Sequence, residues 1–230
     1  MHKKKTKHNK QSRIFFTSDL WIGRNNIIDI FGRPFGSVRE MDERIIENWN
    51  TTVGDEDLVF VLGNFVYDGT RAQNIISDLR GVKIFMMSES DKNILRIDDV
   101  YMDELTLLSD IYMNDAFKDD TDHFVYENFG MLTSEEILNY IERISEKYKP
   151  NVIILKNSII DLARYGIVLS LYPLLEWNGK ESGTLNLHGG VADSSKNLNE
   201  ENRISVRTDF WGFRPIELSE IQTLVSQLKN

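Results

Sequence analysis

The chain has 230 residues, of which 41% are hydrophobic and 27% are charged, and it carries a net charge of −9 with no cysteine. This composition is that of an ordinary globular protein with one α/β domain, and the lack of cysteine excludes disulfides and thiolate metal sites. No apolar run is long enough to span a bilayer, and no apolar stretch of a signal peptide follows Met1. We therefore expect a cytoplasmic protein without a membrane partner.

The first residues differ from the rest of the chain in charge. Six basic residues stand close together there: Lys3, Lys4, Lys5, Lys7, Lys10 and Arg13. The remainder is therefore more acidic than the net charge suggests, and an acidic surface repels phosphate backbones. We predict a disordered basic tail over residues 1–12, a single domain over residues 13–230, and no contact with nucleic acid except through the tail.

The first part of the domain alternates strands with helices. Apolar runs predict strands at residues 14–16, 58–62 and 82–87, and apolar residues at helical spacing predict helices at about 38–50 and 70–81. Ser37 begins the first helix with capping-box spacing, and Met41, Ile45 and Trp49 form its inner face. Residues 27–34 are predicted to be a connecting loop. This alternation predicts a mainly parallel sheet.

Residues 98–150 have a different character. Eight aspartates lie among aromatic residues, a capping-box helix begins near Thr133, and Pro150 ends the segment. We interpret it as an acidic and helical insertion. Further strands are predicted at residues 152–155, 166–170, 184–187 and 203–208, the last with the alternation of a half-exposed strand. The final helix faces inward through Ile221, Leu224, Val225 and Leu228.

The segment of residues 13–28 indicates where a site would lie. Its apolar strand ends at Thr17-Ser18-Asp19, and such a strand brings a carboxylate to the rim of a sheet, where α/β proteins bind their ligands. Residues 19–28 read DLWIGRNNII, which resembles the D-x-H-x-G-H-x-N-I-I opening of the calcineurin-like metallophosphoesterases with both histidines replaced. Framework segments of the small bacterial and phage-type members match in order over about residues 13–97 and 165–222. The resemblance implies a four-layer α/β sandwich.

That family holds two divalent metals at the carboxyl ends of its strands, and the metals stabilise the oxygens of an in-line phosphoryl displacement. In this chain Asp19 keeps its ligand position. The other positions carry different residues: Trp21, Asn64, Glu89, Ser90, Leu171, Gly190 and Ala192. An indole N–H only donates, and leucine has no lone pair, so the resemblance implies a dismantled metal centre.

We expect apolar side chains and arginines to compensate for the lost metals. Trp21 and Leu171 are predicted to fill the vacated volume. Arg24 or Arg207 is predicted to neutralise one of the aspartates of the site: Asp19, Asp91 or Asp209.

The sequence supports three hypotheses for function. The leading one is a catalytically inactive pseudoenzyme that acts as a regulatory protein by binding a protein partner or a second copy of itself. A phage origin would suit such a degenerate enzyme. An alternative is a non-hydrolytic nucleotide or phosphate pocket, with these ligand-binding residues: Arg24, Asn26, Arg207 and His188. The third is a residual phosphoesterase with a single Mg²⁺ or Mn²⁺ on Asp19, Asn64 and Glu89. The first leads because nearly every ligand is replaced beside an intact framework.

Overall fold

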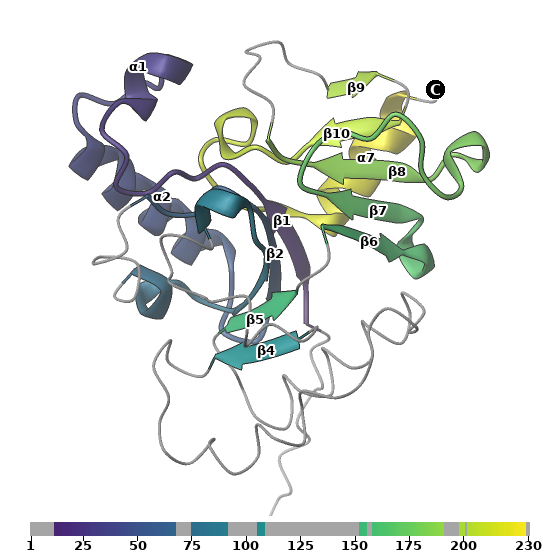
Figure 1. Cartoon of the computed structure of the whole chain (residues 1–230), viewed down its shortest axis with the longest axis horizontal. Coiled ribbons are helices and arrows are strands. Elements are labelled where there is room, and N and C mark those ends of the chain that lie inside the picture. Colours follow the sequence, from purple (N-terminus) through teal and green to yellow (C-terminus); the bar gives the residue numbers. More distant parts are fainter. Residues whose placement is uncertain are drawn as a thin grey trace, which may run out of the picture.

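The chain forms two β-sheets (Figure 1), and a buried hydrophobic cluster contains residues of both. The computed structural model describes residues 12–67, 75–91, 105–108, 152–155, 158–190, 198–200 and 202–228. The predicted basic tail, apart from residue 12, lies outside the described residues, as does most of the predicted insertion at 98–150. Ala192 lies outside them too.

The larger sheet has six strands in the order β11-β1-β2-β3-β5-β4. Its strands are β1 (Ile14–Thr17), β2 (Leu58–Leu62), β3 (Val82–Met86), β4 (Leu105–Leu108), β5 (Val152–Leu155) and β11 (Ile216–Glu217). The four central strands pair in parallel, and β11 and β4 add antiparallel edges. The predicted parallel sheet is confirmed, and it extends by two strands that the sequence did not predict.

The smaller sheet has five strands in the order β6-β7-β8-β10-β9. Its strands are β6 (Ile159–Leu162), β7 (Ile167–Ser170), β8 (Leu185–His188), β9 (Leu198–Glu200) and β10 (Arg203–Ser205). β7, β8 and β10 run parallel, and a bridge between Ser18 and Arg207 links the ends of β1 and β10. The carboxyl ends of strands from both sheets therefore meet.

Alternation along the strands divides the core into two parts. Phe16 and Phe60 stack with their ring centroids 5.7 Å apart in the cluster shared by the two sheets, and the neighbouring Phe15 and Val59 face the other way. Because successive side chains point to opposite faces, a strand buried on both faces reads as a continuous apolar run. The runs at residues 14–17 and 58–62 are explained by this double burial.

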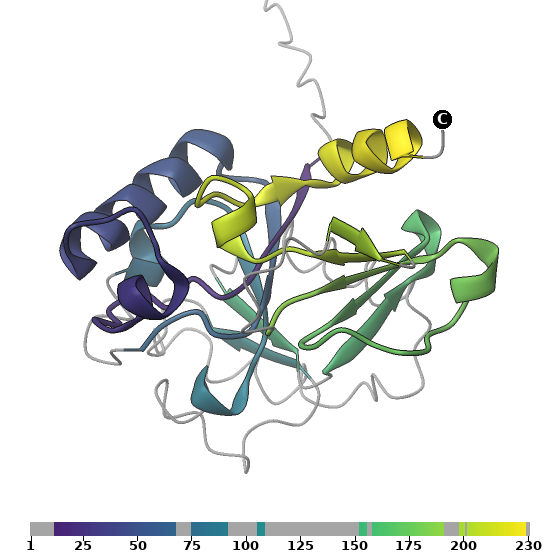
Figure 2. The same ribbon diagram turned by 90° about the horizontal axis from the view of Figure 1, so that it is seen from above.

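Helix α2 (Val38–Thr52) covers the outer face of the larger sheet, and the smaller sheet lies on the opposite side (Figure 2). Ser37 caps the helix by accepting the Glu40 backbone N–H at 3.2 Å, as its spacing predicts. Trp49 is fully buried and donates its indole N–H to the Arg80 carbonyl at 2.9 Å. Helix α7 (Leu218–Leu228) follows β11 and buries Ile221 in the core between the sheets.

Three predictions about local structure were wrong or incomplete. Residues 27–34 are not simply a loop, because helix α1 (Ile27–Phe31) forms there and ends at Gly32 in the left-handed conformation. The predicted half-exposed strand at 203–208 is buried from Ile204 onward, since it lies inside the smaller sheet and then beneath the site. The short strands β4, β6, β9 and β11 were not predicted, and β4 lies inside the predicted insertion.

Candidate functional site

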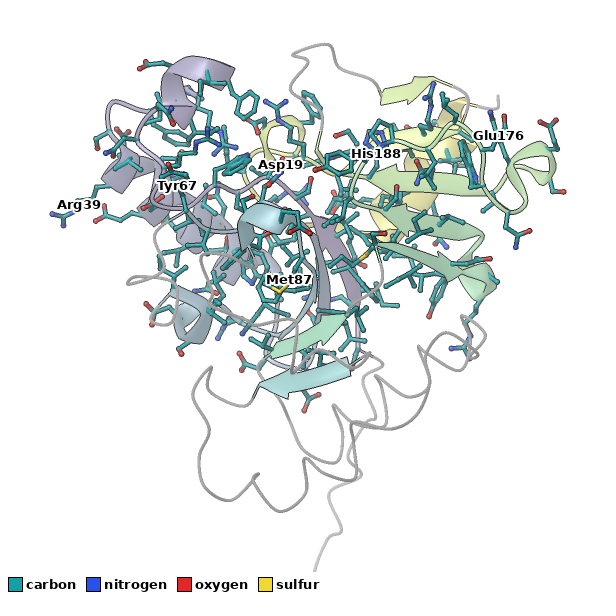
Figure 3. All side chains as sticks on the ribbon, viewed as in Figure 1. Asp19, Arg39, Tyr67, Met87, Glu176 and His188 are labelled. Carbon is teal, nitrogen blue, oxygen red and sulfur yellow. The ribbon has the colours of Figure 1, made fainter. Side chains whose placement is uncertain are left out.

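Asp19 lies between the two sheets, with His188 on the smaller sheet and Tyr67 on the side of α1 and α2 (Figure 3). It stands two residues after the end of β1, and Asn64 stands two residues after the end of β2. Gly190 follows β8, so the smaller sheet also contributes to the site. This is the edge where open α/β sheets place their ligands, and the structure brings these residues together there.

Hydrogen-bond donors surround the carboxylate of Asp19. Its Oδ2 accepts from the Ser18 hydroxyl and from the Gly190 backbone N–H, each at 2.8 Å. Its Oδ1 accepts from the Asn64 side-chain amide at 2.8 Å. The side chain is buried, with 3% of its residue surface exposed. These donors compensate for the water that a buried carboxylate loses.

The pKa of Asp19 is raised by burial, which disfavours the charged carboxylate. The hydrogen bonds from Gly190, Asn64 and Ser18 and the charge of Arg207 act in the opposite direction but do not cancel the effect of burial. The site therefore holds a carboxylate that binds a proton more readily than an exposed aspartate does.

Asn64, in the loop after β2, connects the loop after β1 with the loop after β3. Its amide nitrogen donates to Asp19, and its amide oxygen accepts from the Ser90 hydroxyl at 3.1 Å. Its backbone N–H donates to Asp91 Oδ2 at 2.7 Å. Where the resemblance implies a second carboxylate, this chain has an amide that donates to the first. A like-charge repulsion is thus replaced by a hydrogen bond.

Asp91 fixes the backbone around the site. Its carboxylate accepts the backbone N–H groups of Asn64, Phe65 and Ser88 at 2.7, 2.8 and 3.0 Å, and the Ser88 hydroxyl at 2.6 Å. Burial raises its pKa despite these bonds. The sequence analysis assigned no such role to Asp91. Its position shortly after the end of β3 could have indicated that its carboxylate lies at this edge of the sheet. Asp91 serves as a structural clamp that shapes the loop after β2.

Three non-glycine residues at the site have positive φ angles. They are Asp19 at 56°, Trp21 at 54° and Asn64 at 55°. Positive φ is uncommon for side chains other than asparagine and aspartate, and it is costly for a bulky tryptophan. The Trp21 N–H donates to the Asn64 carbonyl at 2.9 Å and the Asp19 N–H to the Gly63 carbonyl at 3.1 Å, so the two loops hold each other in this conformation.

Trp21 and Leu171 lie at the positions where the resemblance implies histidine ligands. Trp21 is half-buried and packs against the cluster beneath α2, and within the described residues its buried indole nitrogen has no hydrogen-bond partner. Leu171 packs against the core between the sheets, and its Cδ2 lies 3.2 Å from where a Cβ on Gly63 would stand. Each side chain therefore packs into one of the two apolar clusters, and that they fill the volume of lost ligands stays a prediction.

Gly190 is required by both its conformation and its surroundings. Its φ is 70°, and a Cβ there would lie 2.5 Å from the Leu171 carbonyl oxygen and 2.6 Å from the Tyr172 ring. We expect Gly190→Ala to lower the free energy of unfolding, measured by urea denaturation, by about 1–3 kcal/mol more than Gly166→Ala. Gly166 is the matched control because its φ is 64° and its Cβ direction is open. Equal losses in the two variants would contradict this packing account.

Two arginines form ion pairs with Asp209, and one of them, Arg207, also acts on the central Asp19 through its charge. Arg207 is buried and its Nε donates to Asp209 Oδ2 at 2.9 Å, in agreement with one of the predicted pairs. Arg33 also donates to both Asp209 oxygens at 2.9 Å, and it donates to the Asp19 and Leu20 carbonyls at 2.6 and 2.8 Å. Burial raises the pKa of Asp209, but the bonds from the two arginines outweigh it and lower that pKa below its usual value. The sequence did not assign this role to Arg33.

The proposed ligand-binding residues separate into two groups. Arg207 and His188 are each 2% exposed, so neither presents a free face to solvent. His188 Nδ1 lies 3.2 Å from the Gly189 carbonyl, and burial lowers the pKa of the ring. Arg24 and Asn26 lie together at the surface, where Arg24 Nε donates to Asn26 Oδ1 at 3.0 Å. A ligand in solution can therefore reach Arg24 and Asn26.

The donor set does not fit a dinuclear metal centre. Asp19 already accepts three hydrogen bonds, and the facing Asn64 presents its nitrogen to the carboxylate. Glu89, the third oxygen ligand considered for a single cation, has an exposed side chain. Within the described ranges, no group of three or more acidic or histidine side chains gathers in a metal-binding arrangement.

None of the helices in the described ranges has the length and apolar character of a membrane span.

The fold and site define a mixed α/β protein with two sheets and a hydrogen-bonded acidic centre, and the names of the similar proteins given below state no activity. No family model matches the chain. It is 34% identical over 83 residues to an uncharacterized protein of Methanocaldococcus jannaschii, covering 35% of this chain and 47% of that protein. It is 32% and 39% identical to the gene 66 proteins of Mycobacterium phages L5 and D29, over 84 and 62 residues.

These matches are partial. The chain covers 40% of the phage L5 protein and 30% of the phage D29 protein, so it spans less than half the length of the curated relatives it matches. The matches cover 35% and 27% of this chain. A solved structure, that of a protein of unknown function from Aquifex aeolicus, aligns over 93% of this chain and 99% of its own with a TM-score of 0.53 at 18% identity. That likeness concerns the fold alone.

Proposed function

We propose that the chain is a metallophosphoesterase-like pseudoenzyme with the four-layer sandwich of that family, and that it acts by binding rather than by hydrolysis. The two facing sheets, with α2 on the outside of the larger one, support this architecture. The convergence of the loops after β1, β2, β3 and β8 supports a common ancestral site. The similarity to two phage gene products supports a phage setting.

One observation carries the loss of catalysis. The Asn64 amide and the Gly190 backbone N–H both donate to Asp19, in the space where the family's chemistry needs cations held between carboxylates and histidines. A donor pointed at a carboxylate satisfies it without a metal, and a cation placed there would meet the positive end of an N–H dipole. The two-metal displacement therefore has no place to assemble.

A binding role suits the exposed loop between β7 and β8. Tyr172 and Leu175 are 58% and 79% exposed, the two highest values among the large apolar side chains of the described residues. The loop is nevertheless well fixed, because the buried Asn186 accepts the Leu174 N–H at 3.0 Å and Ser170 donates to the Tyr172 carbonyl at 2.6 Å. A rigid loop that presents apolar side chains loses little entropy when a protein partner covers it.

A hydrolysis assay tests the proposal. With bis(p-nitrophenyl) phosphate and Mn²⁺, Mg²⁺, Ni²⁺ or Zn²⁺, we expect the wild-type chain to show no more turnover than Asp19→Ala, because no metal-bound nucleophile forms. Metal analysis of the purified protein should find no stoichiometric cation. Metal-dependent turnover that Asp19→Ala abolishes would overturn the proposal. Anomalous scattering from one cation on Asp19, Asn64 and Glu89 would favour a residual single-metal phosphoesterase instead.

A further inference from the structure

Arg24 is held in place by its neighbours at the rim of the site. Its guanidinium carbon lies 4.3 Å from the centroid of the Trp21 ring and 5.2 Å from that of Tyr67. Its Nε donates to Asn26 Oδ1 at 3.0 Å. Cation–π contacts and this hydrogen bond fix the plane of the guanidinium before any ligand arrives.

The two terminal nitrogens of Arg24 are not used in this arrangement. Within the described residues they make no hydrogen bond or ion pair. Most other described arginines pair with a carboxylate, as in these seven cases: Arg13, Arg33, Arg39, Arg44, Arg80, Arg207 and Arg214. In a chain with a net charge of −9, acidic partners are abundant, so an oriented arginine without one is notable. Its free edge has the fork geometry that binds phosphate or carboxylate through two parallel hydrogen bonds.

Tyr67 adds a second aromatic ring next to the guanidinium of Arg24. It is 53% exposed, although its backbone is fixed by the bridge between Ile22 and Val66 and by its N–H donating to the Ile22 carbonyl at 2.8 Å. The backbone of Trp21 is fixed as well, because its backbone N–H donates to the Asn64 carbonyl. An exposed ring on a rigid backbone stacks on a flat ligand with little loss of conformational entropy.

We propose that Trp21, Arg24, Asn26 and Tyr67 form a binding site for an aromatic phosphate, specifically a nucleoside monophosphate. The phosphate binds the two terminal nitrogens of Arg24, and the base stacks on Tyr67. Trp21 and Asn26 hold the guanidinium in position. A single phosphate suits the site better than a nucleic acid does, because the surrounding chain is acidic and repels a continuous phosphate backbone. The site goes beyond the binding role proposed above and needs no hydrolysis.

Calorimetry on the full chain tests this site with three probes: AMP, inorganic phosphate and adenosine. We expect AMP to bind more tightly than either other probe, since it alone uses both halves of the site. Arg24→Gln should weaken AMP binding about tenfold or more, and Tyr67→Ala should bring it down by about tenfold, towards the affinity for phosphate. Asn26→Ala, which keeps the charge, should weaken it by a smaller factor.

Arg39→Gln is the matched control. Arg39 lies on the surface of α2 and pairs with Glu43, so this variant changes the same charge away from the site and should bind AMP as the wild type does. Unfolding midpoints equal to that of the wild type confirm that the variants are folded. No heat from AMP, or equal AMP affinity in the wild type and Arg24→Gln, would overturn the proposal. Equal affinity for AMP and phosphate would overturn the role of Tyr67.

The same samples separate this inference from the proposed function. AMP that is bound and recovered intact supports both. AMP that is bound and hydrolysed supports the site but overturns the pseudoenzyme. An absence of binding together with an absence of hydrolysis overturns the site alone.

Discussion

Arg33→Met should lower the free energy of unfolding by about 3–5 kcal/mol, the usual effect of removing one partner from a buried ion pair. The Arg33 side chain is fully buried, and its guanidinium donates to both oxygens of Asp209 and to the carbonyls of Asp19 and Leu20. Methionine fills much of the same volume but removes the donors of the two carbonyls and of Asp209 Oδ1, and it leaves Asp209 with Arg207 alone. Urea denaturation measures the loss.

The matched control is Arg39→Met on the surface of α2. Arg39 pairs with Glu43 one helical turn away, and both side chains are well exposed, so we expect a change of about 0.5 kcal/mol or less. A loss for Arg33→Met that is no larger than that of the control would show that Arg33 does not stabilise the site. Retained folding with increased proteolysis near residues 19–35 would agree with the expected local effect.

Asn64→Asp should also destabilise the protein, by about 2–3 kcal/mol at neutral pH. The change restores the carboxylate that the resemblance implies, removes the hydrogen bond to Asp19, and puts two acids where 2.8 Å now separates a donor from an acceptor. Asp19 is already buried with a raised pKa, so a second charge cannot be accommodated beside it at low cost. The variant thus tests whether the amide is essential to the present site.

The destabilisation should depend on pH in a defined direction. Two neighbouring acids share a proton readily, so the folded-state pKa of the pair lies above that of an unfolded aspartate, which is about 3.9. A raised folded-state pKa gives stability at low pH that is lost as the pH rises through it. The difference between wild type and Asn64→Asp should therefore be small at pH 4 and largest above neutrality.

Asn25→Asp makes the same amide-to-acid change at an exposed position in the loop before α1 and should alter stability by about 0.5 kcal/mol or less at any pH. A pH-independent loss in Asn64→Asp would contradict the like-charge explanation. If Mn²⁺ raised the unfolding midpoint of Asn64→Asp but not that of the wild type, the restored carboxylate pair would have regained affinity for a cation.

Much of the fold was predictable because local signals agreed with the tertiary structure. The apolar runs before Asp19 and Asn64 are strands buried on both faces, and such runs have few other stable placements. Ser37 and the spacing of Met41, Ile45 and Trp49 define α2 from cap to buried face. These patterns are short-range, so a single sequence contains them in full.

The rest could not be predicted because it depends on contacts between distant residues. Strand β11 has two residues and forms only because β1 is there to pair with it, and β4 forms against β5. The Arg33 interaction with Asp209 joins positions 176 residues apart. The sequence placed Asp19 and Asn64 at one edge, but whether an amide nitrogen or oxygen would face Asp19 depends on Ser90, which donates to the oxygen.

The left-handed backbone at Asp19, Trp21 and Asn64 has a consequence for engineering and for evolution. This conformation is held by Asp91, by Arg33 and by backbone hydrogen bonds between the loops, and none of these contacts uses a side chain from an altered ligand position. The scaffold and its lining are thus separable: side chains at the rim can be exchanged while the chain path beneath them persists. Under the proposed function, a former reaction centre outlasts its chemistry in this way and is refitted for recognition one residue at a time.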